Sequence, residues 1–454
     1  MSFLYSVFGF LIAIGILVAV HEFGHFWVAR KLGVKVLRFS VGFGKPIWKK
    51  VHGEDQIEYV LGAIPLGGYV KMLGEGSTDE PIKPEEAHRA FDVQPIWKRS
   101  LIVVAGPGIN FLFAILLFML LGMVNEPRVV PMFGDLPETS ILAQAGVNPG
   151  DNLISVDGRP AEYLLQHDLY IFNQVLKGQD IKLEVESNGR AKEIAVQTSD
   201  IPIYNINPGS LMYRLGFARV RPPATTELER VENGTPAAQA GLLAGDKVLS
   251  IDGKPTETWQ DLVAIVGPAA NRKLAIVVDR QGLKVALQAT PEAVEFNGEE
   301  IGRLGVARVF TPLSPEQLVT IDRSPLQALN YGVEKTWLMT SLTFRMLWKM
   351  VTLKVSHKNV NGPITIADVA GQAIQISWQT YVQVLAVISI SLGVMNLLPI
   401  PMLDGGHLLM YAVELFAGQS VSEKVFAVGQ RIGVLLLIGL MSLAFYNDIF
   451  RLLN

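Results

Sequence analysis

Two histidines and a glutamate lie within an apolar segment near the start of the chain. His21 and His25 are four positions apart, and Glu22 directly follows the first of them. On a helix this spacing places both imidazoles on one face, about one turn apart, where they can bind a single metal ion. In the pattern His-Glu-x-x-His the two histidines bind zinc and the glutamate acts as a general base. We therefore predict a zinc site here.

The apolar surroundings strengthen this prediction. A charged group at the centre of a membrane helix costs about 3 kcal/mol on insertion scales, and such residues usually have a function. Neutral imidazoles bound to zinc, with a glutamate hydrogen-bonded to the zinc-bound water, are one way to place these groups there. The alternative is a buried histidine that only completes hydrogen bonds in a helix core.

A catalytic zinc ion generally has three protein ligands and one position open to water. The segment Asn396-Leu397-Leu398-Pro399-Ile400-Pro401-Met402-Leu403-Asp404-Gly405-Gly406 contains a candidate for the third ligand. Its two prolines stop or distort the preceding helix, and together with Gly405 and Gly406 they predict a turn that presents Asp404. Alternative third ligands are His407, Glu414 and Asp368. Asn396 could hold a substrate carbonyl or a developing oxyanion, or could pack between helices.

Composition limits the class of protein. The chain has 454 residues, of which 50% are hydrophobic, and its mean hydropathy is +0.32. These values indicate a membrane protein with soluble insertions. A net charge of -3 gives no basic surface for nucleic acid, so nucleic-acid binding is excluded. Because the chain contains no cysteine, disulfide frameworks and thiolate zinc sites are excluded too.

Four apolar segments are predicted to cross the lipid bilayer, at about 3–29, 100–124, 378–398 and 425–446. Arg30, Lys31, Lys35 and Arg38 follow the first segment, so its C-terminal end should face the cytoplasm. No basic residue precedes this segment, which favours a retained span over a cleaved signal peptide. The first and third spans then run in the same direction, which allows the histidines and Asp404 to lie at one membrane depth.

Glycine-rich stretches between the first two spans predict β structure. The runs at 40–44 and 58–71 are too short to cross a bilayer, so they indicate a re-entrant β-hairpin or a small cytoplasmic sheet. A strand edge near the metal could pair with an extended substrate. The residues predicted to contact the substrate are Gly62, Ile64, Pro65, Leu66, Gly67, Gly68 and Tyr69.

The second predicted span contains Gly106-Pro107-Gly108, which indicates a kink and close helix packing. Asn110 follows two residues later. Its amide could reach the metal site, but we expect it to have a structural role and to bond to a neighbouring helix.

An internal repeat lies between the second and third spans. Residues 143–160 return at 238–255 with ten of eighteen positions identical, and 214–220 return at 303–309. The repeat predicts two copies of one soluble domain on the outer side. The repeated runs resemble PDZ domains, and the resemblance implies grooves that take peptide chain ends by strand addition. It places the carboxylate-binding loops at Leu215-Gly216-Phe217 and Leu304-Gly305-Val306. Spacers without a ligand are the alternative.

A helical pattern of apolar and charged residues at about 324–355 carries too many charges to be a span. It predicts an amphipathic helix on the outer membrane surface, or one that docks a partner. The predicted units are a catalytic membrane half at 1–125, PDZ-like domains at 126–222 and 223–312, outer amphipathic helices at 313–372, and a second catalytic membrane half at 373–454.

Together the His-Glu-Phe-Gly-His motif, the Asn-x-x-Pro-x-Pro-x-Leu-Asp-Gly-Gly motif and the tandem repeat resemble the site-2 protease family of intramembrane zinc metalloproteases. The resemblance covers essentially the whole chain. It implies a polytopic α-helical membrane protein with four transmembrane helices, a re-entrant hairpin and two inserted PDZ-like α+β domains. It also implies zinc ligands His21, His25 and Asp404, the base Glu22, and Asn396 near the substrate.

The same resemblance implies a location and a substrate. The enzyme is expected in the bacterial inner membrane, with the active site towards the cytoplasm and with the PDZ-like domains and both termini in the periplasm. Its expected substrates are single-pass membrane proteins already trimmed on the outer side, notably an anti-sigma factor in an envelope stress response, and remnant signal peptides.

Two other classes of protein share some of these features. A metal transporter would also have histidines and aspartates within its spans, and it predicts a metal flux that survives Glu22→Gln. An inactive scaffold that presents PDZ domains would be unaffected by the same substitution.

Overall fold

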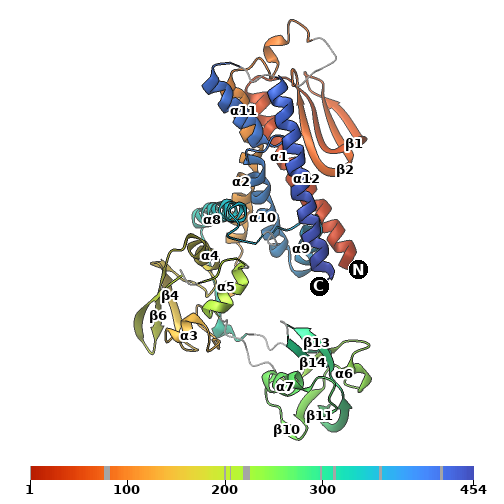
Figure 1. Ribbon diagram of the computed structural model, residues 1–454, viewed down its shortest axis with the longest axis vertical. Helices are drawn as coiled ribbons and strands as arrows, with labels where there is room; N and C mark the ends of the chain where they lie inside the picture. Colours follow the sequence, from red (N-terminus) through yellow and green to blue (C-terminus); the bar gives the residue numbers. More distant parts are fainter. Residues whose placement is uncertain are drawn as a thin grey trace.

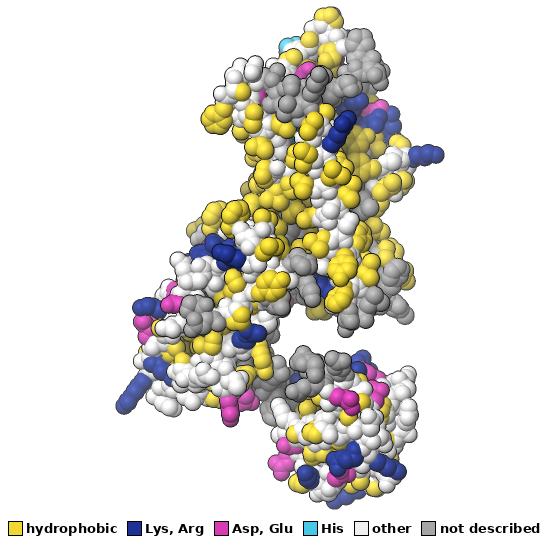
Figure 2. Space-filling view, viewed as in Figure 1, with side chains coloured by type: hydrophobic (Ala, Val, Ile, Leu, Met, Phe, Trp, Pro, Cys, Tyr) yellow, Lys and Arg dark blue, Asp and Glu magenta, His cyan; other side chains and the backbone are white. Residues whose placement is uncertain are grey.

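The structure is a computed structural model that describes residues 2–75, 82–198, 201–204, 206–217, 225–296, 299–309, 313–356, 360–419 and 423–453. Within these residues, four helices are long and apolar enough to cross a membrane. They are α1 (Ser2–Lys31), α2 (Ile96–Gly122), α10 (Trp378–Leu397) and α12 (Glu423–Leu453). They coincide with the four predicted spans and form the upper part of the molecule (Figure 1), where hydrophobic side chains cover much of the surface (Figure 2).

Two glycines bring α1 and α2 into close contact. A Cβ atom on Gly24 of α1 would lie 2.3 Å from the carbonyl oxygen of Ala105. A Cβ atom on Gly106 of α2 would lie 2.2 Å from Nε2 of His25. Only glycine leaves room for these approaches. The predicted close packing at this point of α2 is therefore present, and it presses α2 against the helix that carries both histidines.

The predicted hairpin consists of β1 (Val36–His52) and β2 (Ile57–Met72), which pair antiparallel. Both strands are longer than the predicted runs and both fold back. Ser40 of β1 pairs with Tyr69 and with Val60, so the first half of β1 lies between the two halves of β2. The second half of β1 forms the outer edge, where Trp48 pairs with Leu61. Glycines in the predicted runs mark bends within long strands instead of strand ends, as the positive φ of 90° at Gly42 indicates.

The first repeat copy is a four-stranded antiparallel sheet with flanking helices. Its sheet has the order β5-β4-β6-β7, and Phe133, Phe172 and Leu183 are fully buried in its core. Its elements are α3 (Ile141–Gln144), β4 (Asn152–Val156), β5 (Arg159–Pro160), α4 (Asp168–Lys177), β6 (Ile181–Ser187), β7 (Arg190–Val196) and α5 (Pro208–Leu215).

The second copy repeats this architecture with the sheet order β10-β9-β11-β12. The sequence repeat is therefore a repeat of fold, and the two copies are separate globular units in Figure 1. The second copy also contains a β13–β14 hairpin that the repeat did not predict. Its elements are β8 (Leu228–Val231), α6 (Pro236–Gln239), β9 (Lys247–Ile251), β10 (Lys254–Pro255), α7 (Trp259–Val266), β11 (Leu274–Arg280), β12 (Leu283–Ala289), β13 (Glu292–Phe296), β14 (Glu299–Arg303) and β15 (Val306–Arg308).

Helix α8 (Pro325–Val351) lies across the lower ends of α2 and α10, above the first repeat copy (Figure 1). It begins with a capping box between Ser324 and Gln327. Trp337 and Trp348 on this helix are 73% and 68% exposed. The predicted amphipathic helix is therefore present, and its location on a membrane surface stays a prediction. Just before it, β16 (Leu318–Thr320) pairs with β3 (Pro127–Val129), which ties the two ends of the insertion together.

Two further helices complete the membrane part. Helix α9 (Pro363–Ile376) packs along α1, and a Cβ atom on Gly371 would lie 2.3 Å from the Cα atom of Ser6. Helix α11 (Asp404–Ala417) begins at the predicted third metal ligand, where we had predicted only a turn. A buried cluster that includes Phe26, Val103 and Tyr411 joins α1, α2, α11 and the hairpin. This cluster holds the four elements that surround the histidines.

Candidate metal centre

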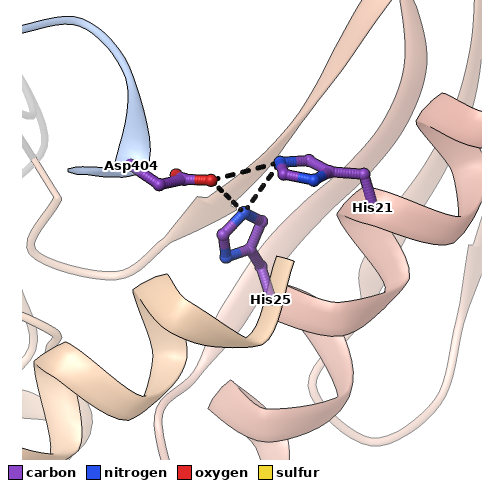
Figure 3. A group of neighbouring side chains, drawn as sticks. All are labelled: His21, His25 and Asp404. Carbon is purple, nitrogen blue, oxygen red and sulfur yellow. Dashed lines mark hydrogen bonds and ion pairs between the residues drawn. The ribbon is translucent and has the colours of Figure 1, made fainter. Parts of the chain in front are cut away.

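His21, His25 and Asp404 come together although almost the whole chain separates the aspartate from the histidines (Figure 3). Nε2 of His21 lies 3.2 Å from Nε2 of His25. Oδ2 of Asp404 lies 3.3 Å from the first of these nitrogens and 3.5 Å from the second. One atom of each residue thus occupies a corner of a nearly equilateral triangle. Helix α1 supplies two corners and the first residue of α11 supplies the third.

This triangle fits a zinc ion. Ligand atoms at about 2.0–2.1 Å from a tetrahedral zinc ion lie about 3.3 Å from one another. Oδ2 of Asp404 is buried and accepts no hydrogen bond from the residues that the structure describes. A buried carboxylate oxygen rarely lacks a partner, so a cation between the three atoms accounts for its position. The donor set of two imidazole nitrogens and one carboxylate oxygen is also one that zinc commonly has at catalytic sites.

The candidate metal position opens into a cavity of about 1020 Å³. Glu22 lines this cavity and is 8% exposed. Next to it is the backbone of Gly68 in β2, where a Cβ atom would lie 2.8 Å from Cγ of Glu22. The cavity therefore exposes the predicted base, the metal ligands and a β-strand to one common space, which is large enough to receive a peptide segment.

Asn396 lies near the end of α10 and lines the same cavity. Its Nδ2 atom is 3.4 Å from Nε2 of His21. The amide is thus beside the candidate metal position on its open side. From there its N–H groups can reach a carbonyl oxygen that approaches the metal.

The alternative third ligands lie elsewhere. His407 is one turn further along α11 and lines the cavity, but the triangle consists of His21, His25 and Asp404. Glu414 accepts a 2.8 Å hydrogen bond from Arg99. Asp368 lies on α9 and accepts a hydrogen bond from Gln372. Among the candidates weighed from the sequence, Asp404 is the carboxylate that the structure brings to the histidines.

Helix α2 contacts each imidazole on the side that faces away from the triangle. Nδ1 of His25 is 2.8 Å from the carbonyl oxygen of Ile102. The amide of Asn110 is 3.1 Å from Nδ1 of His21, so Asn110 reaches the site. Sequence analysis expected a structural role for Asn110 in helix packing, and it missed Ile102 because a backbone carbonyl leaves no signal in residue type.

The predicted substrate-binding residues divide into two groups. Gly67, Gly68 and Tyr69 line the cavity. Gly62, Ile64 and Pro65 precede them in β2 and are not among its described lining residues. Leu66 is also part of β2, but its side chain lies outside what the structure describes.

The two predicted carboxylate-binding loops have different surroundings. In the first copy, Leu215 ends α5, and Gly216 caps this helix with a φ of 101°. In the second copy, Leu304 follows the β13–β14 hairpin and Val306 opens β15. The side chains of Leu215, Phe217 and Leu304 are buried in the domain cores. Within the repeated segment 214–220, residues 218–220 lie outside the described residues.

Comparison with known proteins gives consistent matches over the full length. The model of peptidase family M50 matches residues 9–440. The regulator of sigma-E protease RseP from Escherichia coli is 39% identical over 456 residues, which cover 100% of both chains. Protease RseP from Yersinia pestis is 38% identical over 456 residues, again with 100% of both chains covered. A Vibrio cholerae protein named "Putative zinc metalloprotease" is 40% identical over 453 residues, which cover 99% of each chain.

Proposed function

Because this chain belongs to peptidase family M50 and is a zinc metalloprotease, we propose that it cleaves the transmembrane segments of single-pass membrane proteins. The observation that carries this proposal is the triangle of His21, His25 and Asp404, whose corners lie 3.2–3.5 Å apart between the spanning helices. We assign these three residues as the zinc ligands. A site at this position meets peptide bonds that lie within the bilayer.

The side chains around the triangle have distinct parts in peptide hydrolysis. Zinc, when bound, supplies a Lewis acid that polarises a carbonyl group and acidifies water. Glu22 follows a ligand directly and faces the cavity, so we assign it as the base that takes a proton from the attacking water. The same carboxyl group then protonates the leaving amine. The amide of Asn396 donates a hydrogen bond to the carbonyl oxygen as negative charge develops on it.

A helical substrate must unwind before it can react, because its carbonyl groups are hydrogen-bonded and shielded. We propose that the second half of β2 holds the unwound segment by strand addition. The contact between Gly68 and Glu22 supports this proposal, since a peptide paired with β2 would pass directly beside the base.

Substitution of Gly68 by alanine tests the role of β2. A new Cβ atom would lie 2.6 Å from the carbonyl oxygen of Ser40 and 2.8 Å from Cγ of Glu22, so the strand must shift. We expect kcat/KM for a transmembrane reporter substrate to fall roughly 10–100-fold, because small misplacements of reacting groups cost this much. Gly108→Ala is the matched control, since its Cβ atom meets nothing within 4 Å. Equal cleavage by the two variants would count against strand addition at β2.

We further propose that the chain lies in the bacterial inner membrane with the metal centre towards the cytoplasm. The cations Arg30 and Lys31 at the end of α1 support this orientation, because basic residues collect on the cytoplasmic side. The chain has no cysteine, so single cysteines can be introduced and labelled without background. A cysteine at Glu85 should react with a membrane-impermeant reagent only from the cytoplasmic side, and one at Lys177 only from the periplasmic side. The reverse pattern would invert the proposed topology.

The name of the relative from Escherichia coli, regulator of sigma-E protease RseP, suggests the biological pathway. We propose that the chain acts in a sigma-E envelope stress response on an anti-sigma factor that another protease has already trimmed, and that it also clears remnant signal peptides. The two repeat copies would act as PDZ-like domains in the periplasm. They would bind peptide chain ends and exclude substrates with bulky outer domains.

Deletion of Val130 to Val309 tests the proposed exclusion. Without the repeat copies, untrimmed substrates should be cleaved at a rate that approaches the rate for trimmed ones. Immunoblots of cells that express either form of the substrate measure this ratio. If the deletion variant still cleaves trimmed substrate and still rejects the untrimmed form, the repeat copies are not the filter.

A further inference from the structure

Asn110 contacts His21 on the side of the ring that faces away from the triangle. The side-chain nitrogen of Asn110 lies 3.1 Å from Nδ1 of His21. The other ring nitrogen, Nε2, is the one that lies 3.3 Å from Asp404. Asn110 is 0% exposed, so water does not compete for this contact. The amide is therefore placed to influence which ring nitrogen of His21 carries the proton.

His25, the other histidine of the triangle, shows how a neighbouring group can determine which ring nitrogen carries the proton. Nδ1 of His25 meets the carbonyl oxygen of Ile102 at 2.8 Å. A carbonyl oxygen only accepts hydrogen bonds, so Nδ1 of His25 must be the protonated nitrogen. Its Nε2 is then unprotonated and has a lone pair for a metal ion. For His21 the same condition requires a proton on Nδ1 and an acceptor opposite it.

The Asn110 amide can turn its oxygen or its nitrogen towards His21, because a half-turn about the Cβ–Cγ bond exchanges the two. With the nitrogen towards the ring, Oδ1 is buried and has no hydrogen-bond partner among the described residues. After the half-turn the side-chain nitrogen is the atom without a partner, so this position favours neither orientation of the amide. The protonation of the His21 ring therefore decides between the two orientations. Opposite a protonated Nδ1, a second N–H group would repel, whereas an oxygen accepts.

We propose that Asn110 is a positioning residue whose Oδ1 atom accepts the Nδ1–H of His21 and so keeps Nε2 free to bind zinc. This inference rests on the proposed assignment of His21 as a zinc ligand. Without an acceptor at this position, the buried Nδ1–H would be unpaired, and the tautomer with its proton on Nε2 would compete with metal binding. In this way α2 prepares both imidazoles, one through the backbone of Ile102 and the other through the side chain of Asn110.

The backbone at Asn110 is itself anchored. Its carbonyl oxygen accepts a 2.8 Å hydrogen bond from the hydroxyl group of Ser389 on α10. Ser389 is also 0% exposed. This hydrogen bond and the contact with His21 both involve Asn110. The bond to Ser389, however, does not act directly on the tautomer of the His21 ring. Ser389 therefore offers a matched control.

The zinc affinity of the purified full-length protein, measured by competition with a chelator, tests the inference. Asn110→Leu removes the acceptor at similar volume, and zinc binding should weaken roughly 10–100-fold, as is typical when the partner of a metal-bound histidine is lost. Asn110→Asp keeps an acceptor but has no donor, so its affinity should match or exceed that of the wild type. Loss of affinity in Asn110→Asp would mean that the amide donates to His21, and would overturn the inference.

The remaining outcomes also support or refute the inference. Ser389→Ala should keep its zinc affinity, and a loss equal to that of Asn110→Leu would assign the effect to helix packing instead. Unchanged affinity in Asn110→Leu would refute the role of Asn110. If that variant does not fold, Asn110→Asp against the wild type still separates an acceptor from a donor. A wild-type protein without zinc would instead contradict the proposed metal ligands, so the two failures are distinguishable.

Discussion

Replacement of Glu22 by glutamine is expected to abolish cleavage while the protein keeps its zinc. Glutamine has nearly the same shape as glutamate but cannot take a proton from water. Loss of a general base lowers the rate about 10²–10⁴-fold. His21, His25 and Asp404 are unchanged in this variant, so the atoms of the triangle stay in place. Cleavage of a reporter transmembrane segment, together with metal analysis of the same preparation, measures both quantities.

The same experiment separates the protease from the two other classes. In a metal transporter, Glu22→Gln would leave metal flux intact, and neither the wild type nor the variant would cleave the reporter. In an inactive scaffold, the substitution would change nothing. A variant that loses zinc as well as activity would show that Glu22 supports the metal site, and its assignment as the base would then be wrong.

Replacement of Asp404 by alanine is expected to remove both zinc and activity. Oδ2 of Asp404 is one of the three corners of the triangle, at 3.3 Å and 3.5 Å from the two nitrogens. Its loss leaves two protein ligands for an ion that generally has three at catalytic sites. The zinc affinity should fall by more than the roughly 10–100-fold that loss of an outer-shell partner costs. Chelator competition measures the affinity, and the reporter assay measures cleavage.

His407→Ala is the matched control for Asp404. His407 lies one turn further along the same helix and lines the same cavity, and it was one of the alternative third ligands considered from the sequence. We expect this variant to bind zinc as tightly as the wild type. If His407→Ala loses zinc and Asp404→Ala keeps it, the ligand set is His21, His25 and His407 instead.

Motif spacing and the alternation of spans together were enough to locate the candidate metal ligands. The four-residue separation of His21 and His25 determines their geometry on any helix, and the alternation of spans brings Asp404 to the same depth. Both arguments depend on periodicity and topology, which can be inferred from a single sequence. The four spans and the repeated domain were predicted for the same reason, since apolar length and internal repetition are visible without knowledge of side-chain packing.

What sequence analysis missed depends on contacts between distant residues. Helix α11 follows two prolines and begins with Asp404-Gly405-Gly406, a combination that normally indicates a turn, and its packing against α2 and α10 overrides that local signal. In the hairpin, the predicted run ended at Gly44, whereas Gly44 lies within the long strand β1, whose register shifts on both sides of it. The pairing of Asn110 with His21 also joins two helices, so no local pattern around either residue could reveal it.

The most direct test of the central claim is X-ray absorption spectroscopy of zinc in the purified Glu22→Gln protein, which should retain the metal without turnover. The account predicts two imidazole nitrogens and at least one carboxylate oxygen around the ion, at about 2.0–2.2 Å. A variant that also carries His25→Ala should lose most of its zinc, because only two protein ligands then remain. A zinc shell without imidazole scattering, or one that His25→Ala leaves unchanged, would contradict the proposed metal centre.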